Sequence, residues 1–472
     1  MITFFVSLAL LIIGYFIYGT LVCKIFKPDD RKTPCVEHPD GVDYVPLTKG
    51  RAFLIQLLNI AGLGPIFGAI SGAIWGPSVY LWIVFGTIFA GGVHDFLCGM
   101  LSLRNDGASV AEITGKYLGR TIKNVMRVFS VILLIMVGVV FMVGPAGLLS
   151  LLTNVNVSFW VIVILVYYFI ATFLPIDKII GKLYPLFGLC LIIMAVGVSV
   201  ATILNSNIRP MMELTLENLH PEGNSIWPFM FITVACGAIS GFHATQSPMM
   251  ARCLTSEKDG RFVFYGAMVA EGIIALIWAS AAIAFYYEPN SGLTNLLQAG
   301  GGNSSVVYEI CTSLLGKIGG IFAMIGVIAC PITSGDTAFR SARLTIADWF
   351  KIDQKDIKKR LLLSLPILAS GYIISKFDYQ IVWRYFSWSN QMLAMIVLWA
   401  STAYLGKYVS KISSLITALP AMFMSAICTT YILTAEEGLR LSSTISYPIG
   451  IGVAILFSLV YVYKILLKKS KV

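Results

Sequence analysis

The amino-acid sequence predicts an all-α polytopic membrane protein, a single bundle of about 13 transmembrane helices. Hydrophobic residues make up 57% of the 472 residues and charged residues only 12%, with a mean hydropathy of +0.82. Soluble globular chains carry roughly 25% charged residues, so this chain lacks the charge to cover a water-facing surface. Thirteen apolar segments approach the roughly 20 residues that a helix needs to cross a bilayer.

The predicted spans follow one another through short loops, with one polar stretch between the sixth and the seventh. They cover residues 2–22, 51–74, 79–103, 125–149, 159–174, 183–204, 226–246, 262–287, 317–337, 361–375, 380–405, 412–434 and 445–467. The amino terminus has no charged n-region followed by a small-residue cleavage site. The first segment is therefore expected to be a retained span rather than a removed signal.

Lysine and arginine predict the orientation, because they stay on the cytoplasmic side of a membrane. With the amino terminus outside and the carboxyl terminus cytoplasmic, few of the 34 Lys and Arg residues face outward. These are Arg209, Lys317, Lys376, Arg384 and Arg440. The net charge of +10 is thus spread over short cytoplasmic loops, and it requires no nucleic-acid partner.

Two spans contain helix-breaking stretches, "GLGP" at 62–65 and "GAISG" at 237–241. Each break begins eleven residues into its span, which at 1.5 Å per residue is about 16 Å deep and near the bilayer midplane. Broken backbone is tolerated there only where protein buries it or a cavity wets it, and paired discontinuous helices point to a transporter's binding site. The candidate solute-binding residues at the breaks are Gly62, Gly64, Pro65, Gly237, Ser240 and Gly241.

The two breaks occupy mirrored positions, because the second span runs inside to outside and the seventh runs outside to inside. They predict that spans two to eleven form a five-plus-five core of two inverted repeats, 51–225 and 226–405. Residues 1–50 then hold the first helix and a cytoplasmic loop, and residues 406–472 hold two peripheral helices.

A broken helix can bind a carboxylate without a basic side chain, because it frees backbone N–H groups and presents the positive end of a half-helix. Asn390 and Gln391, about ten residues into the eleventh span, can line the same cavity. An interhelical hydrogen bond is the alternative role for both amides, and close helix packing is the alternative role for the glycines.

Five stretches, "AGLGPIFGAI", "GGVHDF", "ACGAISGFH", "GAMVAEG" and "TSGDTAFRSARL", resemble in this order the signatures of the carbon starvation protein A (CstA) family. The resemblance covers about residues 51–405. It implies a bacterial inner-membrane transporter linked to peptide and pyruvate uptake. It also implies kinship with the amino acid–polyamine–organocation group and the leucine-transporter fold. The chain departs from longer members in its short carboxyl-terminal region and in His94, where many relatives have glutamine.

Glu271 is the ionisable residue expected nearest the midplane, about 14 Å into the eighth span. Charge at that depth is costly and by default marks function. Because burial disfavours the carboxylate, Glu271 is a candidate to bind and release a proton as the cavity opens to either side. The alternative is a permanently protonated carboxyl that donates a hydrogen bond to a neighbouring helix.

Asp95, Asp336 and His243 are expected near the cytoplasmic mouth, roughly 24 to 29 Å from the outer ends of their spans. For the two aspartates the alternative to a proton-coupling role is an ion pair at the inner interface with Arg104 or Arg340. Histidine titrates near neutral pH and can relay protons. The alternative for His243 is a neutral ring that bonds a freed backbone carbonyl.

Thr333 and Ser334 form a candidate sodium site. In leucine-transporter-like folds, which the family resemblance implies, the corresponding helix supplies hydroxyls to a sodium ion against carbonyls of the first broken helix. Here those carbonyls would belong to Ala61 and Gly64, and such oxygen ligands suit a hard cation. The hydroxyls can instead bond the preceding turn of their own helix.

Together these features predict a secondary active transporter that imports a small carboxylate-bearing solute, peptide or pyruvate-like, coupled to protons or sodium. A primary pump is disfavoured, because no G-x-x-x-x-G-K-[ST] loop and no soluble domain occur. An intramembrane enzyme is disfavoured by the lack of H-E-x-x-H and G-x-S-x-G motifs. The nine cysteines show no metal-binding spacing, and no cofactor is expected beyond the coupling ion. A passive channel is the remaining alternative.

Overall fold

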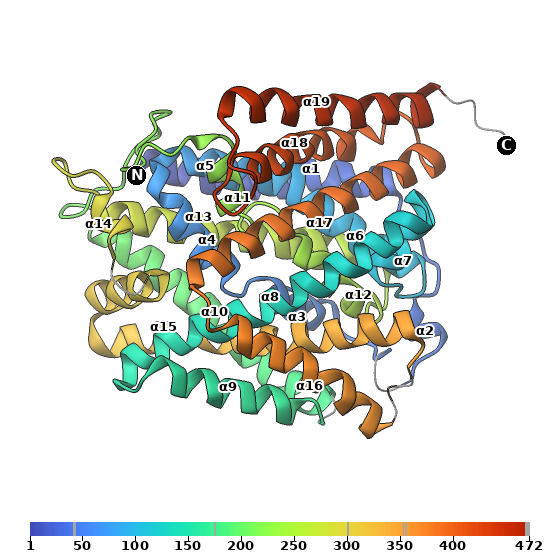
Figure 1. Ribbon diagram of the computed structural model, residues 1–472, viewed down its shortest axis with the longest axis horizontal. Helices are drawn as coiled ribbons and strands as arrows, with labels where there is room; N and C mark the ends of the chain where they lie inside the picture. Colours follow the sequence, from blue (N-terminus) through green and yellow to red (C-terminus); the bar gives the residue numbers. More distant parts are fainter. Residues whose placement is uncertain (41–43, 174–175, 300–301, 353, 355, 468–472) are drawn as a thin grey trace.

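The computed structural model describes residues 1–40, 44–173, 176–299, 302–352, 354 and 356–467, with the side chains of residues 176–185 left aside. Within these residues the backbone is helical, apart from loops and two isolated β-bridges, Leu47 with Leu254 and Glu288 with Gly292. Most long helices run along one direction, with the two termini toward opposite ends of the molecule (Figure 1). The all-helical class is as predicted.

The first half of the chain supplies the first broken helix and two long helices. Its elements are α1 (Ile2–Phe26), α2 (Pro34–Glu37), α3 (Lys49–Ile60), α4 (Gly64–Gly72), η1 (Ala73–Ser78), α5 (Val79–Leu81), η2 (Trp82–Gly91), α6 (Gly92–Arg104), α7 (Val110–Leu118), α8 (Arg120–Thr153), α9 (Val157–Ala171) and α10 (Ile176–Leu204).

The second half supplies the second broken helix. Its elements are η3 (Ile226–Met230), α11 (Phe231–Thr233), α12 (Gly241–Ala251), η4 (Glu257–Asp259), η5 (Arg261–Tyr265), α13 (Gly266–Tyr286), α14 (Thr294–Leu297), α15 (Gly302–Phe350), α16 (Ile357–Ile374), α17 (Tyr379–Tyr408), α18 (Leu415–Thr434), α19 (Ser443–Tyr461) and η6 (Val462–Leu467). α15 bends at Gly316, whose φ of +68° is readily adopted only by glycine. The helical stretch before this bend was not predicted.

Eight helical stretches among the described residues are long and apolar enough to cross a membrane, which supports a multi-pass membrane protein. They are Ile2–Phe26, Gly64–Arg104, Arg120–Thr153, Leu186–Leu204, Glu257–Tyr286, Gly302–Phe350, Leu415–Thr434 and Ser443–Leu467. α9 is apolar but is shorter than the 18 residues required of such a stretch. The seventh predicted span consists of short half-helices, and neither half reaches that length. The count of 13 crossings stays a prediction.

The polar helices lie inside the bundle and the apolar ones lie outside. Of the 18 most apolar consecutive residues, 83% are buried in the stretches Gly64–Arg104 and Glu257–Tyr286. In Ser443–Leu467 only 11% are buried. α1, α9 and α19 expose large apolar side chains along their length. This arrangement favours lipid contact for the outer helices and shields the ionisable residues of the inner ones.

Both predicted helix breaks are present. α3 ends at Ile60 and α4 begins at Gly64, while α11 ends at Thr233 and α12 begins at Gly241. The irregular backbone is therefore 61–63 and 234–240. The expectation that Gly64, Pro65 and Gly241 belong to the irregular backbone is wrong, since they start the second half-helices. Proline suits a first turn, where its missing N–H costs no hydrogen bond.

Candidate functional site

The two helix breaks lie against each other. A Cβ added to Gly64 would lie only 2.3 Å from the Cβ of Cys236, and one added to Gly237 would lie 3.9 Å from the Cα of Pro65. On the other side of the first break, a Cβ on Gly62 would lie 2.6 Å from the ring of Phe141. Glycine is required at 62 and 64 because the neighbours leave no room for a side chain.

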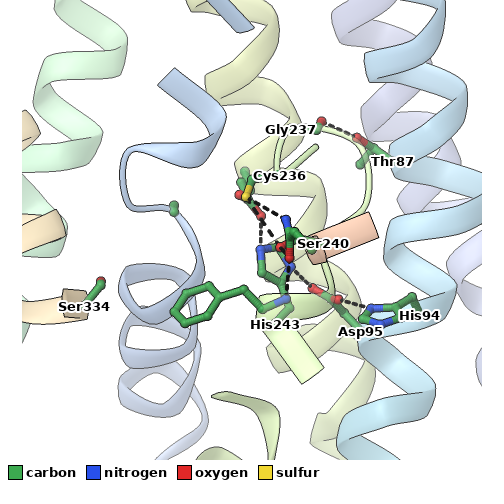
Figure 2. Close-up of polar contacts among 12 residues, drawn as sticks. Thr87, His94, Asp95, Cys236, Gly237, Ser240, His243 and Ser334 are labelled. Carbon is green, nitrogen blue, oxygen red and sulfur yellow. Dashed lines mark hydrogen bonds and ion pairs between the residues drawn. The ribbon is translucent and has the colours of Figure 1, made fainter. Parts of the chain in front are cut away.

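Side chains from a neighbouring segment bond the carbonyls that the second break frees. Trp82 Nε1 donates to the carbonyl oxygen of Val234 and Thr87 Oγ1 donates to that of Gly237, each at 3.1 Å. Figure 2 shows the Thr87 contact above the buried polar group. These bonds explain how irregular backbone is tolerated in the interior of the bundle.

Asn390 caps α12 at its amino end. Its Oδ1 accepts from the Phe242 N–H at 2.6 Å and from Ser240 Oγ at 3.1 Å. The adjacent Gln391 donates from Nε2 to the Phe231 carbonyl at 2.9 Å. The interhelical hydrogen bonds that were the alternative for both amides are thus present, and the Phe242 N–H is already occupied.

Four buried ionisable side chains form a continuous chain next to the second break. Asp95 Oδ1 lies 2.8 Å from His94 Nδ1, and Asp95 Oδ2 lies 2.8 Å from His243 Nδ1. His243 Nε2 lies 3.2 Å from Glu271 Oε2. All four side chains are fully buried, and Figure 2 shows Asp95 between the two rings. We call these four residues the buried relay; they come from α6, α12 and α13.

In the relay, Asp95 is hydrogen-bonded on both carboxylate oxygens, whereas His94 Nε2 and the Glu271 carboxyl are not hydrogen-bonded among the described residues. An ionised carboxylate only accepts hydrogen bonds, so both rings present an Nδ1 proton to Asp95. The contact between His243 and Glu271 is within ion-pair distance but is not aligned as a hydrogen bond, and His94 Nε2 has no hydrogen-bond partner among the described residues. A proton can therefore sit on either side of the His243–Glu271 contact without disturbing Asp95.

The structure excludes two of the alternative roles considered for these residues. Asp95 does not pair with Arg104, because nine residues of helix separate them by about 13.5 Å. Arg104 instead binds Glu257, with its Nε and Nη2 each 2.9 Å from a carboxylate oxygen. His243 bonds a carboxylate rather than a freed carbonyl.

Asp336 lies outside the relay. Its Oδ2 is 3.3 Å from Arg340 Nη2, one turn along α15, so the ion pair that was the alternative for this residue is confirmed. Sequence reasoning missed His94 as a relay member and Glu257 as the partner of Arg104. His94 had a visible signal, since it adjoins Asp95 within a predicted span. Glu257 had none, because it lies in a polar loop.

Thr333 and Ser334 lie beside the first break. Ser334 Oγ is 3.1 Å from the carbonyl oxygen of Leu58 and 3.0 Å from that of Cys330. Thr333 Oγ1 bonds the Cys330 carbonyl at 2.8 Å, and Cys330 Sγ is 3.3 Å from the carbonyl oxygen of Ala61. The carbonyls facing this part of α15 are thus Leu58 and Ala61. Both hydroxyls also bond their own helix, as the alternative role required.

Gly64, the other carbonyl expected there, begins α4 on the far side of the break and takes no part in these hydrogen bonds. Among the described residues, no group of three or more His, Cys, Asp and Glu has a metal-binding arrangement. In the view of Figure 2, Ser334 stands apart from His243 and Asp95. The oxygen cluster and the relay are therefore separate features of the interior.

Comparison with known proteins relates the chain to transporters. A family model described as "Carbon starvation protein CstA" matches residues 1–148 and 145–307, in agreement with the resemblance of the motifs. A Haemophilus influenzae protein named "Uncharacterized membrane protein" is 43% identical over 353 residues, covering 64% of this chain and 95% of its own. "Peptide transporter CstA" of Bacillus subtilis is 27% identical, covering 88% and 86%. "Pyruvate/proton symporter BtsT" of Escherichia coli is 24% identical, covering 93% and 81%.

Solved structures with a similar fold include a manganese transporter. MhsT in complex with L-phenylalanine aligns with a TM-score of 0.56 at 15% identity, covering 88% of this chain and 97% of its own. A manganese transporter of Eremococcus coleocola aligns with a TM-score of 0.55 at 13% identity, covering 90% and 98%. At these identities the likeness concerns the fold alone.

Proposed function

Since the chain belongs to the carbon starvation protein CstA family, whose named relatives are transporters and not enzymes, we propose that it is a proton-coupled secondary active importer. Its solute is a small molecule with a carboxylate, a peptide or a pyruvate-like acid. The repeats 51–225 and 226–405 move relative to each other so that the breaks open to one side of the membrane at a time.

The buried relay is the observation that carries this proposal. With both carboxylates ionised and both rings neutral, the four groups hold two negative charges in a fully buried site. Burial of uncompensated charge is costly, so the closed site favours an added proton, shared by His243 and Glu271. When water reaches the site from one side, the charged form is solvated again and the proton is released there.

The relay is also placed to couple the proton to movement of a broken helix. His243 lies in the first turn of α12, while Asp95 and Glu271 lie on α6 and α13. Protonation changes the charge that holds α12 between these two helices. We infer that this change alters the equilibrium between inward-open and outward-open states, because a ligand shifts an equilibrium toward the state that binds it better.

The solute is proposed to bind between the two breaks. Gly64 and Cys236 are in direct contact, so a solute enters only when the half-helices separate. Backbone N–H groups at the start of α4 and α12 can then hold its carboxylate, with Asn390 releasing the Phe242 N–H. This requirement favours alternating access over a passive channel, which needs an open path.

Sodium is the second candidate for the coupling ion, and a separate observation favours it. The carbonyls of Leu58 and Ala61 face Ser334 and Cys330 across the α3–α15 contact. A cation held by these oxygens and by Thr333 would fix the first broken helix to α15. Oxygen ligands without a carboxylate suit a weakly bound hard cation.

Solute uptake into proteoliposomes under imposed ion gradients tests the proposal. Labelled pyruvate and a labelled dipeptide are offered with a pH gradient, with a sodium gradient, or with neither. Saturable accumulation above equilibrium with the pH gradient alone is expected. Uptake that only reaches equilibrium under every gradient would identify a passive channel. Accumulation with the sodium gradient alone would show that sodium is the coupling ion and would favour its site at the α3–α15 contact.

The orientation is part of the same proposal, with the amino terminus outside and the carboxyl terminus cytoplasmic. A membrane-impermeant maleimide applied to intact cells is expected to label Arg440→Cys and not Lys407→Cys, because both positions are exposed at opposite ends of the last helices. The reverse labelling pattern would invert the orientation.

A further inference from the structure

A second polar site lies away from the relay, where α7, the start of α8 and the end of α15 meet. In space, these parts lie on the side of the molecule where the carboxyl terminus is found (Figure 1). They enclose a cavity of about 680 Å³. Its lining includes five basic residues and one tryptophan: Lys116, Arg120, Lys123, Arg127, Lys351 and Trp349. Neither the relay nor the helix breaks contribute a residue to it.

The cavity carries positive charge that the protein does not neutralise. Glu112 is its one lining carboxylate, and it is engaged by Lys123 at 2.5 Å and by Arg127 at 2.9 Å. Among the described residues, Arg120 and Lys351 form no ion pair, and both are exposed. One further carboxylate, Asp348, interacts electrostatically with Lys351 and Arg127 but does not line the cavity. The excess of basic groups attracts an anion.

An apolar stripe begins beside this cavity. Val125, Val128 and Ile132 follow the lining residue Asn124 along α8, and they are 39%, 43% and 48% exposed. Their spacing of three and four residues puts them on one helix face. Trp349 lines the cavity, with the Arg127 guanidinium 5.8 Å from its ring centroid. Tryptophan is typical of this level of a membrane protein, where headgroups meet hydrocarbon.

We propose that this cavity binds the headgroup of an anionic phospholipid whose acyl chains lie along the α8 stripe. Free phosphate would satisfy the basic residues but would leave the stripe unexplained, so the lipid is the better occupant. The lipid joins α7, α8 and α15 at one end. It thereby stabilises the two long helices that reach the breaks through Phe141 and Ser334. This inference does not depend on the proposed solute or coupling ion.

Native mass spectrometry of the purified full chain tests the site. The protein is titrated with phosphatidylglycerol, with cardiolipin and with zwitterionic phosphatidylcholine. The variant Arg120→Gln/Lys351→Gln removes two of the three exposed lining cations that form no ion pair among the described residues; the third, Lys116, donates a hydrogen bond to Asn105 Oδ1. The control Lys358→Gln/Lys359→Gln makes the same charge change at exposed residues outside the cavity. Gel filtration verifies that both variants are monodisperse.

The wild type and the control are expected to retain phosphatidylglycerol or cardiolipin in preference to phosphatidylcholine. The cavity variant is expected to bind the anionic lipids roughly 25-fold more weakly, since each of the two basic groups contributes about a fivefold factor near an anionic lipid. Equal weakening in the control, or no weakening in the cavity variant, would overturn the site. Displacement of the lipid by millimolar glycerol 3-phosphate would instead assign the cavity to a soluble phosphate.

Discussion

Asp95 accepts a hydrogen bond on each of its carboxylate oxygens, and both donors are histidine rings. This arrangement satisfies a carboxylate that has no water contact, and it fixes which nitrogen of each ring carries a proton. Glu271 differs, because one of its oxygens faces only His243 Nε2 at 3.2 Å and the other has no hydrogen-bond partner among the described residues. The two carboxyls are therefore suited to different roles, Asp95 to positioning and Glu271 to proton exchange.

The substitution Glu271→Gln keeps the shape of the side chain and removes its proton exchange. We expect solute counterflow to continue, because the breaks and their hydrogen bonds are untouched. Accumulation driven by a pH gradient should fall to the level measured without a gradient. Proteoliposome uptake measures both, and Ser280→Ala, another buried polar residue of α13, is the matched control. Undiminished pH-driven accumulation in Glu271→Gln would remove Glu271 from the coupling mechanism.

Gly64 supports a prediction about space rather than charge. Gly64→Ala places a methyl group 2.3 Å from the Cys236 Cβ, so it is expected to destabilise the closed state by about 1 to 3 kcal/mol. A thermal-unfolding midpoint in detergent measures this loss. Gly50→Ala is the control, since nothing lies within 4 Å of its added Cβ.

A second substitution separates steric overlap from a general effect at this position. Cys236→Gly removes the Cβ that the new methyl group meets, so the double variant is expected to recover most of the lost stability. If the double variant is as unstable as Gly64→Ala alone, the two breaks are not in the direct contact that the structure describes.

At the scale of the elements, the interior is organised by two interrupted helices and the helices that bond their free ends. α17 caps α12 through Asn390, and α15 bonds the end of α3 through Ser334. These contacts replace hydrogen bonds that a continuous helix would make within itself. A contact between helices can be broken and remade more readily than an intrahelical bond, which suits elements that move during transport.

The α3–α15 contact yields the prediction for sodium. If the carbonyls of Leu58 and Ala61 bind sodium together with Thr333 and Ser334, the ion stabilises the folded protein by mass action, by about 2.7 kcal/mol at 100 times its Kd. The unfolding midpoint is expected to be higher in sodium chloride than in choline chloride at equal ionic strength. Thr333→Val and Ser334→Ala should each reduce this difference, and Ser280→Ala should not. Identical midpoints in the two salts would leave the hydroxyls a structural role.

At the scale of the whole molecule, the segment 27–33 between α1 and α2 is bound to η4. Its Arg31 lies 3.3 Å from Glu257, a fully buried carboxylate that also binds Arg104 from α6. Glu257 also accepts from the Asp29 N–H, and the side-chain hydrogen bond from Arg31 lowers the pKa of Asp29. One buried carboxylate thus joins the first loop, α6 and η4.

Glu257→Gln is expected to destabilise the protein by about 3 to 5 kcal/mol, because it leaves the largely buried Arg104 without its carboxylate partner, whereas Arg31 keeps Asp29. The measurement is the thermal-unfolding midpoint in detergent. Glu217→Gln, at an exposed position with no ion pair among the described residues, controls for the loss of one negative charge. Equal midpoints for the two variants would contradict a joining role for Glu257.

The sequence by itself determined the membrane class, the two helix breaks and the presence of ionisable residues among apolar ones. These are local properties: composition sets the solvent that a segment prefers, and glycine with proline interrupts a helix wherever it lies. The motif stretches around "AGLGP" and "ACGAISGFH" likewise identified the family, because a motif is read directly from residue order.

Only the tertiary structure decided which of these residues meet. Asp95 and His243 are 148 positions apart, and their contact depends on the rotation and depth of α6 and α12, which pattern reasoning places only to within a few residues. An error of two residues turns a side chain by more than half of a helical turn, enough to aim it at a different neighbour. For that reason the contacts of Ser334 with Leu58 and of Gly64 with Cys236 emerged only from the packed helices.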